Sequence, residues 1–419
     1  MRMAAGLSLH DLSVQVHYSR GHLSKVENSV AVPSPALVRL ADAAVHASGQ
    51  LIAFLEMHVD SGQSPGGTGD QTWTTIMDPG SGTWFSSAEP GQPVIQPAVS
   101  GFGIPPVSKV SPAQAEQLLQ TYRASFDQFR TAARLVDPRL LLPTLWAATH
   151  ALRQLAGAAR PPDRQRALVL ASRYAELAGW LAQEAGDDRA ALWWTDHAVQ
   201  LAEAGGDSML GAYACVRRAL VALYRGDVVG TVEHARQAQS RADVPMMVRG
   251  LAALREAQGL ALGGDDLECR RAIDRGADCL ARAEGDVPAD PALGSTSLAD
   301  PVAVTTGWCL YDLGYPAQAA DALGREIAKI PAGSTRAQVR FSTRQALAAV
   351  AAGDVDRGCE ITHGLLSSAG DLGSATIRCD LRQLARALRR WPAHQGVREI
   401  QPGLDQLLRV PAALSQPKG

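Results

Sequence analysis

Apolar residues recur at helical spacing along most of the chain, with one long interruption. In residues 1–58 and again in residues 111–410 they return every three to four positions, as on one face of a helix. Residues 59–110 sustain no such period, and Gly, Pro, Ser and Thr predominate there. The pattern predicts an all-α protein in which a small helical bundle (1–58) is joined by a flexible, largely disordered linker (59–110) to a large helical domain (111–410) and a short tail (411–419).

The large helical domain begins at a clear start signal and contains an internal repeat. Ser111 and Gln114 stand at the two positions of a capping box, with Pro112 between them at the first helical position. Further along, a Gly breaks the helical pattern five times, at steps of 40, 38, 50 and 39 residues, and the longest step includes an inserted loop. The breaks are Gly186-Asp187, Gly226-Asp227, Gly264-Asp265, Gly314-Tyr315 and Gly353-Asp354. Gly can end one helix and Asp can cap the next, so we expect antiparallel helix pairs that stack into an α-solenoid.

The N-terminal bundle is predicted to hold three short helices around a common core. Ser8 is placed to cap the first, Ser19 to cap the second, which spans 19–28, and Ser34 to cap the third, with Pro35 at its first position. The residues expected to face the core are Leu9, Leu12, Val16, Leu23, Val26, Leu37, Leu40, Ala41 and Ala44.

The charge of the chain bears on whether it can bind nucleic acid. The net charge of −2 excludes a globally basic nucleic-acid coat protein, but it does not exclude a small DNA-binding domain. Residues 1–58 carry four basic and four acidic side chains, so their attraction to phosphate is expected to be weak. Of the 40 basic residues in the chain, 36 are Arg, which is typical of a GC-rich genome.

The sequence contains no pattern that indicates catalysis. It lacks a Walker A loop, a G-x-G-x-x-G and a G-x-S-x-G at a suitable junction, so we predict no enzyme and no cofactor. The six cysteines form no C-x-x-C and lie at no zinc-ligand spacing, so we predict no metal site and interpret them as buried free thiols, with a redox sensor as the alternative. No signal peptide and no apolar stretch of about 18 residues is present, which predicts a cytoplasmic protein without a membrane span.

Two resemblances give these elements a functional reading. The string S-R-G-H-L-S-K-V-E-N, followed by P-S-P-x-L, resembles the Cro/C1-type (Xre) helix-turn-helix family. Only five residues precede Gly6, so the first helix of that family is expected to be truncated. Residues 165–370 resemble tetratricopeptide (TPR) repeats, although the usual unit of about 34 residues is shorter. The combination is similar to actinobacterial regulators that join such a head to TPR-like repeats.

The resemblance implies that helix 19–28 enters the major groove of double-stranded operator DNA. The DNA-binding residues that it implies are Ser8, Ser19, Arg20, His22, Ser24, Lys25 and Asn28. Arg20 would read a guanine, while Ser8 and Asn28 would contact phosphate. We therefore expect a homodimeric transcriptional regulator whose repeat domain senses a peptide, protein or small ligand or mediates dimerisation. The alternative is a TPR-like protein-interaction scaffold whose degenerate head does not bind DNA.

Overall fold

The computed structural model describes residues 7–16, 23, 26, 35–45, 47, 72–78, 82–88, 101–104, 107–240, 244–283, 298 and 300–409. The chain divides into two compact units. One comprises residues 1–76 with 83–104, and the other comprises residues 105–419 with 77–82. The helical fold class predicted from the sequence is confirmed, with the exception of one segment considered below.

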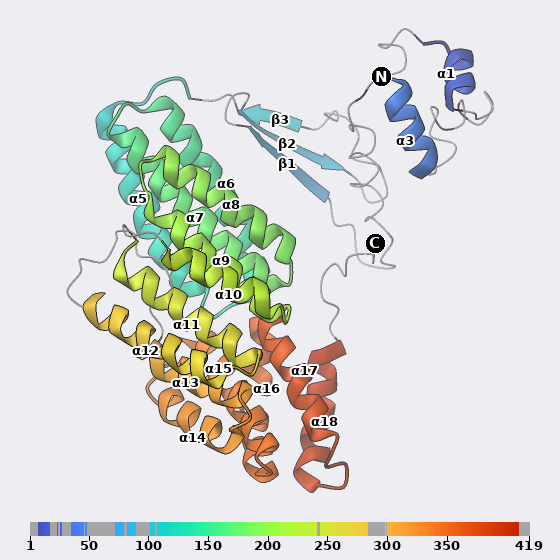
Figure 1. The fold of residues 1–419 in the computed structure, drawn as a ribbon. Coiled ribbons are helices and arrows are strands. Elements are labelled where there is room, and N and C mark those ends of the chain that lie inside the picture. The colour runs from blue at the N-terminus through green and yellow to red at the C-terminus, as the bar shows by residue number, and fades with distance from the viewer. Residues whose placement is uncertain are drawn as a thin grey trace. The chain divides into compact units, whose positions relative to one another are not determined.

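The N-terminal unit contains α1 (Leu9–Val16) and α3 (Pro35–Ala44), drawn in blue in Figure 1. Their shared core consists of buried Leu12, Val16, Leu23 and Leu37, with Leu9, Val26, Ala41, Ala44 and Val45 packed against it. The predicted core is confirmed at every position except one. Leu40 is 43% exposed, because it lies at the edge of the inner face of α3, and the neighbouring Val38 is buried in its place.

A three-stranded sheet lies within the segment that the sequence predicts to be a structureless linker. Its strands are β1 (Thr72–Asp78), β2 (Gly82–Ala88) and β3 (Gly101–Ile104), in the order β1-β2-β3. Strand β2 pairs antiparallel with β3, from Thr83 opposite Ile104 to Ser86 opposite Gly101. This corrects the linker prediction at these residues. The strands are short and separated by Gly and Pro, so they give no sustained period, but they concentrate the aromatic and β-branched residues that favour strands.

The second unit is built of helices arranged as successive antiparallel pairs, from cyan to red in Figure 1. The pairs are α5 (Pro112–Ala132) with α6 (Pro138–Ala158), α7 (Asp163–Ala185) with α8 (Asp188–Ala204), α9 (Met209–Tyr224) with α10 (Val228–Gln239), α11 (Met246–Leu262) with α12 (Asp266–Ala283), α13 (Pro301–Asp312) with α14 (Pro316–Ile327), α15 (Thr335–Ala351) with α16 (Val355–Leu372), and α17 (Ala375–Leu388) with α18 (Gln395–Arg409). The predicted solenoid of helix pairs is confirmed.

The predicted break points are the turns between paired helices. All five glycines have positive φ, between 73° and 98°, a region that residues with a Cβ rarely adopt. The side chains of Asp187, Asp227 and Asp354 accept hydrogen bonds from the first turns of α8, α10 and α16. At the start of the domain the capping box is confirmed, since the hydroxyl of Ser111 accepts from the amide of Gln114 at 3.3 Å. Local chemistry therefore determines where each helix of a pair ends and the next begins.

The six cysteines all have free thiols, and they lie on helices of the second unit. Cys215, Cys269, Cys309 and Cys359 are buried, while Cys279 and Cys379 are half-buried. Within the part of the chain that the structure describes, no helix combines the length and the apolar character needed to cross a bilayer.

Candidate functional site

Ser8 is the one predicted DNA-binding residue within the described part of the chain. Its hydroxyl accepts a hydrogen bond from the amide of Asp11 at 3.1 Å, and its own amide donates to Oδ2 of Asp11 at 2.8 Å. This reciprocal pair fixes the start of α1, and the bonds to Ser8 lower the pKa of the Asp11 carboxyl. Its contact with phosphate stays a prediction. The other predicted residues lie outside the described ranges: Ser19, Arg20, His22, Ser24, Lys25 and Asn28.

The repeat unit contains a partly open cavity of about 240 Å³. Its wall comes from the first helix of six successive pairs, α5, α7, α9, α11, α13 and α15, which we call the inner helices, together with the residues just before α13 and just after α5. Much of the wall is apolar or aromatic. The aromatic lining residues are Phe126, Trp180, Tyr213, Tyr224, Trp308 and Phe341.

Arginine is the dominant charged residue of this wall. Six arginine residues line the cavity, against a single lining acidic residue, Glu176. The six are Arg130, Arg134, Arg217, Arg255, Arg336 and Arg340. Each lies on an inner helix or, for Arg134, on the turn that follows α5, so helices far apart in sequence contribute charge to one space. The sequence analysis identified none of these residues as functional.

Part of this positive charge is neutralised by the protein itself. Arg217 forms an ion pair with Glu176 and also donates to the hydroxyl of Tyr213 at 3.3 Å. Arg336 and Arg340 both form ion pairs with Glu184, which lies behind the wall near the end of α7.

Arg255 has no such compensation. Among the described residues it forms no ion pair, and its guanidinium donates a hydrogen bond to the neutral side chain of Gln258. Burial lowers the pKa of Arg255 to about 10, and the positive charges of Arg340 and Arg217 contribute to the lowering. Arg255 therefore stays protonated at neutral pH, as a half-buried cation within electrostatic reach of two other arginines.

Several polar atoms at the wall are also left without partners. Within the described part of the chain, the hydroxyl of Tyr224 and the Nε atoms of Arg217 and Arg340 are buried and make no hydrogen bond. Buried polar atoms are nearly always hydrogen-bonded, so a group of orphaned donors at one cavity calls for an explanation.

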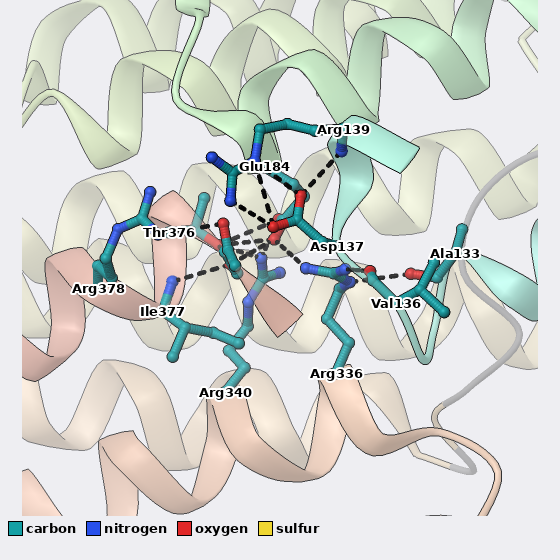
Figure 2. Close-up of polar contacts among 12 residues, drawn as sticks. Ala133, Val136, Asp137, Arg139, Glu184, Arg336, Arg340, Thr376, Ile377 and Arg378 are labelled. Carbon is teal, nitrogen blue, oxygen red and sulfur yellow. Dashed lines mark hydrogen bonds and ion pairs between the residues drawn. The ribbon is translucent and has the colours of Figure 1, made fainter. Parts of the chain in front are cut away.

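A buried polar cluster lies where α7, α15 and α17 meet (Figure 2). We call Glu184, Arg336, Arg340, Ser374 and Thr376 the Glu184 cluster. The Glu184 carboxylate is fully buried and pairs with Arg336 at 3.1 Å and with Arg340. It also accepts hydrogen bonds from Ser374 at 2.6 Å and from Thr376 at 3.0 Å. These partners come from α15, from the residue before α17 and from α17 itself.

The partners of Glu184 keep it ionised. Burial by itself raises the pKa of this carboxyl, but Arg340, Arg336 and the two hydroxyls outweigh burial and lower the pKa to about 2. A charge buried in this way is compensated only when its full set of partners is in place. The Glu184 cluster therefore requires α7, α15 and α17 to stay together.

Arg336 extends this connection to the turn between α5 and α6. Its backbone amide donates to the carbonyl of Arg134 at 2.9 Å, and its guanidinium donates to the carbonyls of Ala133, at 2.9 Å, and Val136 (Figure 2). Residues about 200 positions apart in the sequence thus meet. The turn after α5 and the start of α15 are therefore joined directly, which brings the first and the last of the inner helices together beside the cavity.

Regularly spaced arginines on α15, a helix that is otherwise mostly buried, are a sequence signal for the cavity and the Glu184 cluster that was not recognised. Arg336, Arg340 and Arg344 are spaced four apart on α15, so they share one face, and Arg336 and Arg344 are buried. Arg344 pairs with buried Asp380 at 2.9 Å and lies 3.6 Å above the ring of Trp308.

Across the described ranges, no group of three or more His, Cys, Asp or Glu side chains is placed to hold a metal ion.

Comparison with known proteins adds information chiefly on the N-terminus. No curated protein matches the chain. Among solved structures, the chain is similar to one titled "Crystal Structure of Rap Protein Complexed with Competence and Sporulation Factor", at 11% identity and a TM-score of 0.43, over 70% of this chain and 98% of that chain. Residues 1–55 match the family model described as "Helix-turn-helix domain". The chain therefore carries a helix-turn-helix domain at its N-terminus, followed by a unit of helical repeats.

Proposed function

We propose that this protein is a sequence-specific, non-enzymatic transcriptional regulator whose head binds DNA and whose repeat unit senses a ligand. The observation that carries the proposal is the match of residues 1–55 to a helix-turn-helix domain. The buried contacts of α1 with Leu23, Val26 and α3 support it, because a recognition helix needs such a core to hold it against DNA.

On this proposal, helix 19–28 lies in the major groove of double-stranded DNA. Arg20 donates to a guanine, while His22, Ser24 and Lys25 reach bases or phosphates. Residues 1–58 have balanced charge, so one head alone attracts phosphate weakly. We therefore propose a homodimer that reads two half-sites about 34 Å apart, or a multiple of that distance.

The repeat unit supplies the regulatory part of the proposal. A peptide, protein or small molecule that binds one state of the protein more tightly than another shifts the population toward that state. The cavity supports ligand sensing, because a concave space lined by apolar and aromatic side chains with a few polar groups is typical of ligand-binding sites. We place the protein in the cytoplasm, where operator DNA is accessible.

An electrophoretic mobility shift experiment tests DNA binding. The purified full-length chain is titrated against fragments of the genome that encodes it, at several salt concentrations. We expect the protein to slow the migration of a subset of the fragments. The affinity for these fragments should fall as the salt concentration increases, because phosphate contacts release counterions. If no fragment is retained even at low salt, the regulator proposal is wrong and the scaffold alternative takes its place.

The variant Arg20→Ala sharpens this experiment. It should cost about 1–3 kcal/mol of binding free energy and relax the preference at one base position, as measured with single-base variants of a retained fragment. Arg39→Ala, on α3, removes the same charge from the same domain and serves as the control. An equal loss for Arg20→Ala on every sequence would contradict base reading by this residue.

A further inference from the structure

We propose that the cavity binds a small oxyanion, a carboxylate or phosphate carried on an apolar or aromatic body, with Arg255 as its main charge partner. The proposal deepens the function proposed above by naming the chemical class of the ligand, and only its regulatory meaning rests on that function. The binding itself is argued from the cavity.

Charge is the first argument. Six arginines line the cavity against one lining carboxylate, and Glu176 pairs with Arg217 while Glu184 pairs with Arg336 and Arg340. Arg255 forms no ion pair within the described ranges, and it lies within electrostatic reach of Arg217 and Arg340. An uncompensated cation inside a protein is costly, and an anion in the cavity removes that cost.

The orphaned polar atoms are the second argument. The Nε atoms of Arg217 and Arg340 can only donate hydrogen bonds, and the hydroxyl of Tyr224 can also donate. All three belong to residues that line the cavity, but each atom has almost no accessible surface, so a ligand reaches it only when these side chains move. The partner that these donors lack is a hydrogen-bond acceptor. Carboxylate and phosphate oxygens are acceptors that match the planar fork of a guanidinium.

Size and the apolar wall define the rest of the ligand. A volume of about 240 Å³ lies below the range of about 300–1,000 Å³ that is usual for ligand pockets, so a long peptide does not fit inside. Aromatic rings such as Trp180, Trp308 and Phe341 line the space beside the arginines. A small acid with an apolar or aromatic body fits these walls. A peptide could place only its C-terminal residue there, with the terminal carboxylate toward the arginines.

The position of the arginines also indicates what binding would do. Arg217, Arg255 and Arg340 belong to α9, α11 and α15, on different repeats, and their like charges repel. An anion among them replaces this repulsion with attraction to all three helices. Arg340 also belongs to the Glu184 cluster, so the same anion would stabilise the closure of the repeat array.

Binding can be tested on the full-length chain by isothermal titration calorimetry and by thermal unfolding. The probes are phenylacetate and phenyl phosphate, with neutral phenylacetamide as the uncharged analogue and sodium chloride at matched ionic strength. We expect at least one of the two acids to bind saturably and to raise the unfolding temperature, whereas the amide and chloride do not. The dipeptide Gly-Phe and its C-terminal amide then distinguish a peptide terminus from a free acid as the source of the oxyanion.

Three single-residue variants test whether the acid binds in the cavity. Arg255→Gln should weaken binding of the acid at least tenfold without lowering the stability of the ligand-free protein, because it removes an uncompensated cation. Arg325→Gln, an exposed residue in the last turn of α14, makes the same chemical change away from the cavity and should leave binding unchanged. Tyr224→Phe removes one orphaned donor, keeps the ring, and should weaken binding to a smaller extent.

Two results would overturn the proposal: neither acid binds beyond the chloride control, or an acid binds equally well to Arg255→Gln. The DNA experiment is separate, so the two proposals can fail independently. Retention of DNA without binding of an oxyanion rejects the ligand class alone. Binding of an oxyanion without retention of any DNA fragment rejects the regulator alone.

Discussion

At the scale of single residues, Glu184 shows how a buried charge can be made compatible with folding. Its carboxylate has no exposed surface, yet two arginines and two hydroxyls satisfy it. Arg255 is the opposite case, because within the described ranges no carboxylate pairs with it. The first arrangement joins distant parts of the chain, and the second leaves a positive charge without a pairing carboxylate in the described ranges.

Glu184→Gln should destabilise the repeat unit by about 3–5 kcal/mol at pH 7, because it leaves the buried Arg336 and the half-buried Arg340 without their counter-charge. The folded-state pKa of Glu184 is about 2, below the ordinary value of 4.5, so the stabilisation is fully present above pH 4.5. It is lost as the pH falls from about 5 toward 2. Urea denaturation followed by circular dichroism measures the difference between the two proteins at each pH.

The exposed Glu203→Gln on α8 is the matched control for that variant and should change little at any pH. A difference between the native protein and Glu184→Gln that stays constant down to pH 2 would contradict the ionised, fully paired state of Glu184.

At the scale of elements, local sequence predicted the helix pairs but not the sheet. The turns were predictable because glycine with positive φ and an aspartate cap leave a direct signature, as at Gly186-Asp187. Strands β1 to β3 were not, since seven residues or fewer between Gly and Pro are too short for a period to show. The cavity arginines were missed for another reason. Arg217 and Arg255 lie 38 positions apart, and only the tertiary fold brings them to one space.

Glycine substitutions test how tightly neighbouring helices approach. A Cβ at Gly205, which follows α8, would lie 2.8 Å from Cγ2 of Val169 and 3.0 Å from its backbone nitrogen, so Gly205→Ala should destabilise by roughly 1–3 kcal/mol. A Cβ at Gly157 on α6 meets no described atom within 4 Å, so Gly157→Ala should stabilise by up to about 1 kcal/mol. Thermal unfolding of both variants checks the predicted opposite signs. Equal shifts would mean that α7 and the end of α8 are not in close contact.

At the scale of the repeat unit, direct contact between its early and late helices distinguishes it from an open solenoid. In an open array each repeat contacts only its neighbours, and a change in a late repeat is felt locally. Here Ser374 and Thr376 reach Glu184, about 190 residues earlier. The prediction of a solenoid was therefore correct for the pairs but did not include this closure, which depends on contacts that no local pattern reveals.

The double variant Ser374→Ala with Thr376→Val removes two hydroxyls with little change in volume. We expect faster amide hydrogen exchange at the C-terminal end of α7, measured by mass spectrometry on peptides that cover residues 177–185, because Glu184 loses two of its partners. Exchange in α12, which contributes nothing to the Glu184 cluster, is the internal control. If exchange becomes faster only in α16–α18, the change is felt only by neighbouring helices, and the repeat unit behaves as an open solenoid.

The composition of the cavity wall has a consequence for how ligand preference can change. Each of the six inner helices contributes a few lining side chains, and no single repeat holds the whole site. A substitution on one inner helix therefore alters one part of the recognition surface, while the turns and caps that maintain the architecture lie elsewhere. Designed variants can therefore change the proposed ligand preference by exchanging residues one repeat at a time, with the helix-turn-helix domain left unchanged.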